Sequence, residues 1–382
     1  MRKGLDPVLL TCVAVLLLLS ILMVSSASLS VSEVRYHNAF RIISHWLLYI
    51  PLGLLVMWGI SRIPLPVWQR FCFPLLLVAF VVMVVLLVAG NHLNGATRWF
   101  SLFGFSAQPV ELLKPAVILY MAYYMGHFPE RLQYFSQGMG PMLAILSVAV
   151  GLLMMQPDFG NTVLICSCCF LMWFVGGVPS RHLLLVFIVG VFLGAIAMMA
   201  EPYRFERLLS FTNPWHDPFK SGYQLIQSML AFGSGGIWGL GLGQGIQKLF
   251  YLPEAFTDFI AAVLGEELGL LGSLLLLGIF SILIGRGIYI ATRCEHAFER
   301  LLALGCTLLI GLSFYINFAA VTGMIPTKGM PIPFFSYGGS ALLGNCVLMG
   351  FLLAIYRSLP VKNNENSKKH MQAKKKIDKE IV

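Results

Sequence analysis

Ionisable side chains inside or beside long apolar runs are the residues of this sequence that could do chemistry. They are Glu111 with Lys114, then Asp258, then the adjacent acids Glu266 and Glu267. Charges are costly in an apolar environment, so such residues are functional candidates by default. Glu111 and Lys114 are three residues apart and would share one helix face, where they could form a structural ion pair or bind a ligand. Two adjacent acids at the depth of Glu266 and Glu267 must be paired, protonated or facing a wet cavity.

Basic residues also gather in segments that would lie on one side of the apolar runs: Arg98, Lys114, Arg204, Arg207, Lys248 and Lys328. Gln108 and Asp158 border the same side, where we expect structural or cavity-lining roles. Each motif taken singly is explained by anchoring at a membrane interface, where cations and aromatic rings are common. Together, the cations would suit an anionic, membrane-borne substrate handled on that side.

The elements that must position these residues are membrane helices. The chain has 382 residues, 58% of them hydrophobic and only 11% charged, with a mean hydropathy of +0.81. An ordinary soluble domain has about 25% charged residues. The net charge of +9 could suggest a nucleic-acid partner, but eight of the 26 Lys and Arg residues lie in the tail from Arg357. Such a tail is suited to anionic lipid headgroups, so we expect no nucleic acid.

Ten apolar runs reach the length of about 20 residues that a bilayer requires. They lie near 8–27, 43–61, 71–89, 110–127, 139–156, 160–178, 182–200, 258–285, 301–323 and 340–357. The sequence therefore predicts an all-α integral membrane protein with about ten transmembrane helices. We expect one membrane domain over 1–358 and a disordered basic tail over 359–382.

The basic residues orient the predicted helices. With a cytoplasmic N-terminus, the inner segments hold seventeen Lys and Arg residues, and the short outer loops hold Arg35, Arg41, Arg98 and Lys328. Because positive charge favours the cytoplasmic side, both termini are expected there. The long loop 201–257, between the seventh and eighth helices, then faces outside.

The centre of this long loop is apolar and rich in glycine, with seven glycines between Gly233 and Gly245. That composition is suited to an interfacial or re-entrant element, in which backbones approach closely. Neither of the glycine-rich nucleotide motifs occurs in the loop, so we expect no nucleotide.

At this point the motifs resemble the SEDS family (shape, elongation, division and sporulation), over about residues 8–358. The resemblance rests on Gly222–Ser228, Gly233–Gly236, Leu252–Phe259, Gly265–Gly269 and Pro331–Ser340. It implies a bacterial ten-helix enzyme that polymerises peptidoglycan glycan strands from lipid II. The runs 326–329 and 213–215 resemble division-type members more than elongation-type ones, and the sporulation branch shares these features.

The resemblance also implies roles for residues. The family's proposed catalytic aspartate matches Asp258, and its important Glu and Lys match Glu111 and Lys114. Two positions depart from the pattern: Val110 stands where Ser is usual, and Phe256 where His is usual. We take the second departure to indicate that the His is dispensable.

The implied chemistry is an inverting glycosyl transfer. The acceptor sugar hydroxyl must lose a proton, which Asp258 could accept as a general base, while a lipid pyrophosphate leaves. Lys114, the outer arginines or a divalent cation such as Mg²⁺ or Mn²⁺ could stabilise that pyrophosphate.

The location and partner follow from the same resemblance. We expect the bacterial cytoplasmic membrane at the division septum, with a class B penicillin-binding protein and other divisome membrane proteins as partners. The Gly-rich segment, or Gly305 and Gly311 in the ninth run, could supply the close packing that a partner helix needs. The alternatives are a lipid II flippase, an elongation-type polymerase and a scaffold that only recruits a polymerase.

Overall fold

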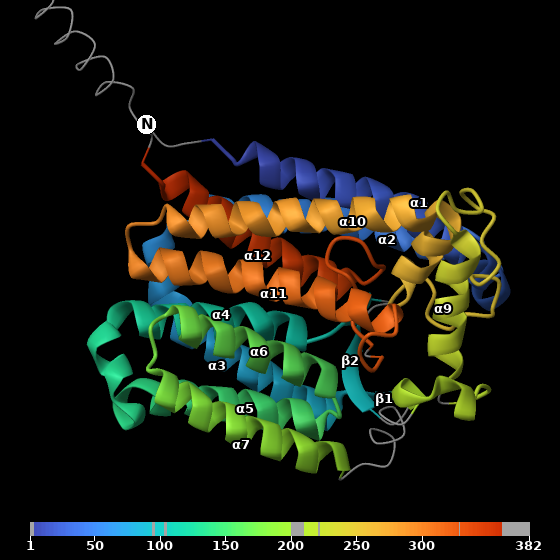
Figure 1. Cartoon of the computed structure of the whole chain (residues 1–382). Coiled ribbons are helices and arrows are strands. Elements are labelled where there is room, and N and C mark those ends of the chain that lie inside the picture. Colours follow the sequence, from blue (N-terminus) through green and yellow to red (C-terminus); the bar gives the residue numbers. More distant parts are fainter. Residues whose placement is uncertain are drawn as a thin grey trace, which may run out of the picture.

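The computed structural model describes residues 4–93, 96–102, 105–199, 210–220, 222–327 and 329–360, and they form a bundle of long helices (Figure 1). Both ends of the described chain lie at the same end of the bundle. There Asp6 forms an ion pair of 2.8 Å with Arg286, and the Arg286 guanidinium lies 5.7 Å from the Tyr356 ring. We call this the terminal end, and the opposite end, which carries the strands and helix α9 in Figure 1, the loop end.

The helices in chain order are α1 (Pro7–Tyr36), α2 (Arg41–Arg62), α3 (Leu65–Ala89), α4 (Val110–His127), α5 (Gly140–Met155), α6 (Phe159–Val175), α7 (Ser180–Met199), α9 (Tyr223–Gly235), α10 (Ile260–Thr292), α11 (Ala297–Val321) and α12 (Gly339–Ser358). Short helical turns cover Pro129–Gln133, Phe135–Met139 and Pro214–His216. Three strands, β1 (Asn91–Leu93), β2 (Ala96–Leu102) and β3 (Phe105–Ala107), complete the described fold.

Each of the ten predicted apolar runs coincides with one of these helices. Within the described residues, eight helices are long and apolar enough to cross a membrane, and α6 is a shorter apolar helix. The remaining run is α4, which carries Glu111 and Lys114 near its start. The chain is a multi-pass helical membrane protein, as the composition predicts.

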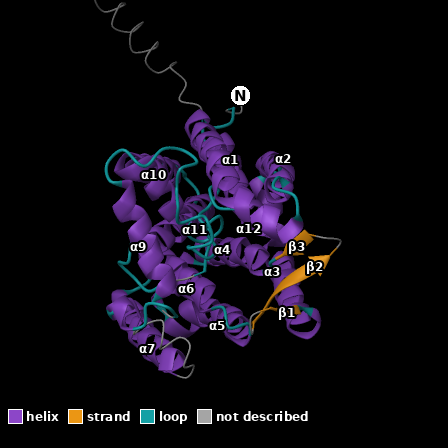
Figure 2. Cartoon of the chain, turned by 90° about the vertical axis from the view of Figure 1, so that its right-hand side faces the viewer, coloured by secondary structure: helices purple, strands orange, loops and turns teal. Residues whose placement is uncertain are grey.

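Helix α4 can carry these charges because other helices surround it. Thirteen of its 18 residues are buried, including Glu111 and Lys114, and it packs against α3, α11 and α12. Figure 2, which looks onto the loop end, shows α4 among the other helices. Helix α7 is the opposite case: only 11% of its apolar window is buried inside the protein, so it is a peripheral helix.

The small antiparallel sheet β1-β2-β3 at the loop end is an addition to the predicted all-α fold. In it Phe100 pairs with Ala107 and Leu102 with Phe105, so β2 and β3 form a hairpin that leads directly into α4. The sequence analysis predicts no strand here, and the three strands are only three to seven residues long.

Helix α10 begins later than predicted and is broken. It starts at Ile260, so Asp258 lies just before the helix, and Gly269 interrupts it with φ 65° and ψ −156°. The backbone of the Gly-rich segment supplies hydrogen bonds at the break: Leu240 N donates to Glu266 O at 3.0 Å, and Leu270 N donates to Gly236 O at 2.9 Å. The segment predicted to be re-entrant therefore packs against α10 backbone to backbone.

Two glycines proposed above for partner contact are interior residues. A Cβ at Gly305 would lie 2.5 Å from a side-chain carbon of Ile118 in α4, and a Cβ at Gly311 would lie 2.9 Å from Ile284 in α10. Both glycines therefore allow α11 to pack against other helices of this chain. The prediction that Gly305 and Gly311 contact a partner helix was wrong. The predicted tail lies outside the described residues from position 361 onward.

Candidate functional site

Asp258 lies at the loop end, in the turn that precedes α10 and beside the segment that precedes α12. It is half-buried, and its backbone carbonyl accepts a hydrogen bond of 2.8 Å from Asn317 Nδ2 in α11. The same nitrogen donates to the carbonyl of Met330 at 2.5 Å. A Cβ built on Gly329 would lie 3.0 Å from Asp258 Oδ2, so the carboxylate reaches this neighbouring segment.

The turn that carries Asp258 is held by its own residues and by Tyr337. Thr257 Oγ1 donates to Glu254 Oε2 at 2.8 Å, and Phe259 N donates to Glu254 O at 3.2 Å. Tyr337 N donates to Phe256 O at 3.1 Å, and the two rings meet edge to face with centroids 5.6 Å apart. Phe256, which departs from the family pattern, therefore serves as a packing residue here.

Tyr337 itself is not a candidate base. Burial raises the pKa of its phenol to about 12, so the hydroxyl stays protonated near neutral pH. Asp258 precedes Phe259, the N-cap of α10, and the partial positive charge of a helix N-terminus favours a negative charge there. Of these two groups, the carboxylate is the one suited to accept a proton.

Glu111 and Lys114 form the ion pair that their spacing predicts, with 2.6 Å between Lys114 Nζ and Glu111 Oε1. Their side chains are only 7% and 10% exposed. A Cβ at Gly344 of α12 would lie 2.7 Å from Glu111 Oε2, so glycine there leaves room for the carboxylate. Val110, the other departure, is buried in the first turn of α4, where a hydroxyl would need a partner.

One segment connects these two clusters. In residues 330–340, Tyr337 N donates to Phe256 O in the Asp258 turn, and the Met330 carbonyl shares the Asn317 amide with the Asp258 carbonyl. At the start of α12, Ser340 Oγ accepts from Gln108 N at 3.1 Å and donates to Ser106 O at 3.1 Å. Asp258 and the entry to α4 are therefore both fixed to the same segment at the loop end.

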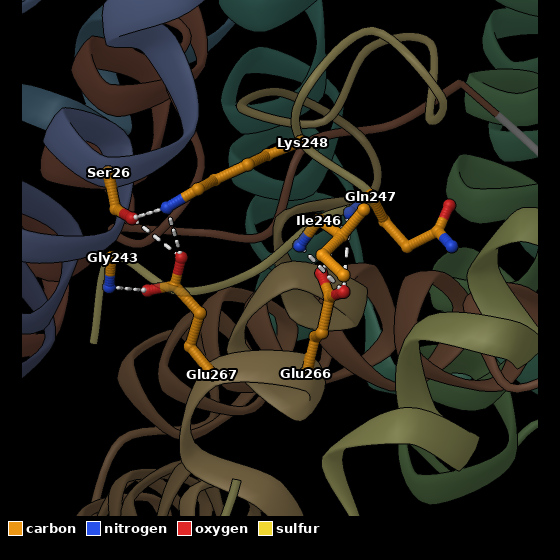
Figure 3. A network of polar contacts seen from close by, with 7 residues as sticks. All are labelled: Ser26, Gly243, Ile246, Gln247, Lys248, Glu266 and Glu267. Atoms are coloured by element: carbon orange, nitrogen blue, oxygen red, sulfur yellow. Dashed lines mark hydrogen bonds and ion pairs between the residues drawn. The ribbon is translucent and has the colours of Figure 1, made fainter. Parts of the chain in front are cut away.

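Glu266, Glu267 and Lys248 form a separate buried network, shown in Figure 3. Lys248 Nζ lies 2.6 Å from Glu267 Oε1 and 2.6 Å from Ser26 Oγ in α1. Glu266 accepts from the backbone nitrogens of Ile246 and Gln247. Glu267 is paired with Lys248, the first of the three predicted possibilities, and Glu266 is hydrogen-bonded to the loop backbone. This contact gives Lys248 a structural role, whereas its substrate contact stays a prediction.

Arg98 and Asp158 contact helix ends. Arg98 Nε donates to Gln156 O at 3.2 Å, and its guanidinium also contacts the Pro157 carbonyl, so it caps the C-terminal end of α5. Asp158 caps α6 by accepting from Asn161 N at 3.2 Å. These contacts position helices, and nothing in them tests a role in substrate binding.

Arg204, Arg207 and Lys328 lie outside the described residues. In the part of the chain that is described, no group of three or more His, Cys, Asp or Glu side chains could hold a metal ion. The divalent cation stays a prediction.

Asn317 was missed by the sequence analysis. The residue is buried, with 1% of its surface exposed, in an otherwise apolar stretch of α11. A signal was present, because a polar amide within an apolar run is unusual enough to mark a contact. Its contact partners, however, are backbone carbonyls that sequence spacing does not reveal.

Comparisons with known proteins agree with one another. The family profile FTSW_RODA_SPOVE, described as a cell cycle protein, matches residues 7–360. A Coxiella burnetii protein named probable peptidoglycan glycosyltransferase FtsW is 42% identical over 357 residues, which cover 92% of this chain and 95% of that protein. A Saccharophagus degradans protein of the same name is 38% identical and covers 95% of each chain.

Two solved structures share the fold. A chain of a peptidoglycan synthase complex, described as coordinating polymerization and crosslinking, superimposes with a TM-score of 0.77 at 26% identity, covering 93% of this chain and 98% of that one. The rod shape determining protein RodA of Thermus thermophilus superimposes with a TM-score of 0.70 at 26% identity, covering 94% and 99%.

Proposed function

Since the chain belongs to the FtsW, RodA and SpoVE family of cell cycle proteins, we propose that it is an inverting peptidoglycan glycosyltransferase that polymerises lipid II. The relatives named as peptidoglycan glycosyltransferases match it over nearly their whole length. The division-type reading follows these relatives, which carry the name FtsW.

The observation that carries the proposal is the fixed position of Asp258. Its carbonyl is bound by Asn317, and its turn is bound by Tyr337, so the backbone on both sides of the carboxylate is anchored. In the reaction, the acceptor hydroxyl oxygen forms a bond to the donor sugar as the bond to the lipid pyrophosphate breaks. Asp258 accepts the hydroxyl proton, and general-base catalysis of this kind contributes about 10²–10⁴ in rate.

The leaving pyrophosphate needs positive charge close to it. Lys114 is a candidate, and its pair with Glu111 keeps it ordered until substrate arrives. Arg204, Arg207, Lys328 and Arg98 stay proposals for the same task. A Mg²⁺ or Mn²⁺ ion would also neutralise the pyrophosphate, but the described residues offer no cluster for it, and we derive no step through a metal.

The proposed setting is the bacterial cytoplasmic membrane, with the loop end outside and both termini in the cytoplasm. The excess of Lys and Arg in the segments assigned to the inner side supports this orientation. A class B penicillin-binding protein is the proposed partner, and the similar chain from a synthase complex supports a partner of that kind. Recruitment to the division septum is part of the same proposal.

Replacing Asp258 by Asn tests the proposal, because the shape is kept while the basic carboxylate is removed. We expect polymerisation of labelled lipid II by the purified protein to fall by about 10²-fold or more. Asp217→Asn, at the loop end but outside the cluster, should retain activity at a similar protein level. Full activity of Asp258→Asn would remove the catalytic assignment.

A flippase is the alternative that this assay can distinguish. Protein that moves labelled lipid II across vesicles, yet makes no glycan strands with or without a partner, would favour flipping. The clustering of the described polar candidates at the loop end favours chemistry on one side of the membrane instead.

A further inference from the structure

Asp258 lies within the stretch from Gly243 to Glu267, whose two ends are joined by a hydrogen bond. Gly243 N donates to Glu267 Oε2 at 3.0 Å, so the chain leaves Gly243, passes through Asp258 and returns to Glu267. Lys248 Nζ binds the other oxygen of the same carboxylate, Oε1, at 2.6 Å. Holding the ends of a flexible segment together removes much of its conformational freedom.

Glu266, the residue before Glu267, also accepts hydrogen bonds from the backbone of the loop. Glu266 Oε1 accepts from Ile246 N at 2.8 Å and from Gln247 N at 3.2 Å. Closer to Asp258 along the chain, Leu252 N donates to Gln247 O at 2.8 Å. Figure 3 shows the two carboxylates pointing toward the loop from the same stretch of α10.

Ser26 fastens this closed loop to a distant helix. Its hydroxyl donates to Glu267 Oε1 at 2.6 Å and lies 2.6 Å from Lys248 Nζ, so α1, α10 and the loop meet at one point. Glu267 is fully buried and the Lys248 side chain is 7% exposed. A buried charge that loses its partner is strongly destabilising, so the contact is maintained.

We propose that Ser26, Lys248 and Glu267 form a latch that positions Asp258 for catalysis. The latch acts through the loop and does not touch the substrate. The proposal rests on the function proposed above, because it takes Asp258 as the base. It assigns Lys248 to positioning, where the sequence analysis expected substrate binding.

The first test is Lys248→Met, which leaves Glu267 without its cation. We expect faster hydrogen–deuterium exchange over 249–258 and a kcat lower by about 10²-fold, the cost of a misplaced reacting group, with KM changed less than about threefold. The matched control is Arg286→Met. It breaks the ion pair that joins Asp6, the N-cap of α1, to α10 at the terminal end, and should leave exchange over 249–258 and kcat near their original values.

Two results would overturn the proposal. Unchanged exchange over 249–258 would show that the ion pair does not order the loop. A raised KM with unchanged kcat would show that Lys248 binds substrate directly.

A covalent replacement of the latch separates positioning from folding. A Cβ at position 245 would lie 3.1 Å from Glu267 Cγ, the atom whose place the sulfur of a cysteine at 267 would take, so the two positions are close enough for a disulfide. In the variant Gly245→Cys, Lys248→Met, Glu267→Cys, the polar latch is absent and the disulfide can be opened or closed in one preparation. We expect the oxidised form to regain most of the kcat and the reduced form to remain slow. Slow exchange together with low kcat in the oxidised form would contradict the proposal.

Failure of the latch and failure of the proposed function give different results. If the unmodified protein makes no glycan strands, the proposed function fails, while the exchange comparison still decides whether the latch orders the loop. If the unmodified protein is active, Asp258→Asn is inactive and Lys248→Met is fully active, the function stands and the latch is overturned.

Discussion

The side chain of Asn317 holds the backbone of Asp258 by a hydrogen bond to its carbonyl. The Asn317 amide donates to the carbonyls of Asp258 and Met330, so one side chain joins two segments of the site. Its Oδ1 is buried without a hydrogen-bond partner among the described residues, which fixes the amide through its nitrogen alone.

Asn317→Leu should therefore lower activity. The change leaves two carbonyls without their donor, at a cost of about 1–3 kcal/mol for each buried group. We expect the polymerisation rate to fall by about tenfold or more, because a small displacement of a reacting group is costly. Ser313→Ala is the matched control, since Ser313 is buried in the same helix and its hydroxyl donates to Leu309 O within its own turn. Equal rates for both variants would contradict a positioning role for Asn317.

The Glu111–Lys114 pair allows structure and binding to be separated. Lys114→Met leaves a buried carboxylate unpaired and should destabilise the protein by about 3–5 kcal/mol. The double change Lys114→Met, Glu111→Gln leaves no lone charge, so thermal stability should largely return. If Lys114 binds the pyrophosphate, polymerisation should stay as low in the double variant as in the single one. Recovery of both stability and activity would assign the pair to structure alone.

Among the elements, the broken helix α10 and the Gly-rich segment depend on each other. Gly239 has φ 82°, and a Cβ there would lie 2.1 Å from the carbonyl oxygen of Glu267. The close approach lets Leu240 and Gly241 donate to the carbonyls of Glu266 and Glu267, which the break in the helix exposes. Gly239 is therefore needed for the close packing of this segment against the α10 backbone.

Gly239→Ala should lower the unfolding temperature and activity together, because the added carbon must displace the Glu267 backbone. Gly243→Ala provides the control: its φ is also 82°, but nothing lies within 4 Å of its Cβ. Both variants bear the left-handed backbone cost of about 1–2 kcal/mol, and only Gly239→Ala adds the clash. Comparable thermal shifts in detergent for the two variants would show that the close packing is unimportant.

At the scale of the whole molecule, the described chain packs its polar candidates at one end and leaves apolar helix surface for lipid or partners. Helix α7 is almost entirely exposed, whereas about 70% of the apolar windows of α11 and α12 is buried. Glycine content does not reveal a partner surface here, because Gly305 and Gly311 face other helices of this chain.

We expect the isolated protein to be weakly active, and a class B penicillin-binding protein to raise its turnover strongly. This expectation follows from the proposed partnership, which the similar chain from a peptidoglycan synthase complex supports. Turnover on labelled lipid II, measured with and without each candidate partner, checks this. The same rate in every combination would favour a polymerase that works alone.

The sequence by itself determined the membrane helices and the identity of the polar candidates. A run of about 20 apolar residues has few alternatives to a membrane helix, because every backbone group must be satisfied internally in lipid. The i, i+3 spacing likewise determined the pairing of Glu111 with Lys114, which lie on one helix turn.

Only the tertiary structure decided what contacts Asp258, Glu267 and Lys248. Asn317 and Met330 reach the Asp258 site from other elements, and Ser26 meets Glu267 across 241 positions of sequence. It also decided that Gly269 breaks α10 and that β2 and β3 form a hairpin. These outcomes depend on contacts between distant segments, and a local pattern carries no information about which segment arrives beside it.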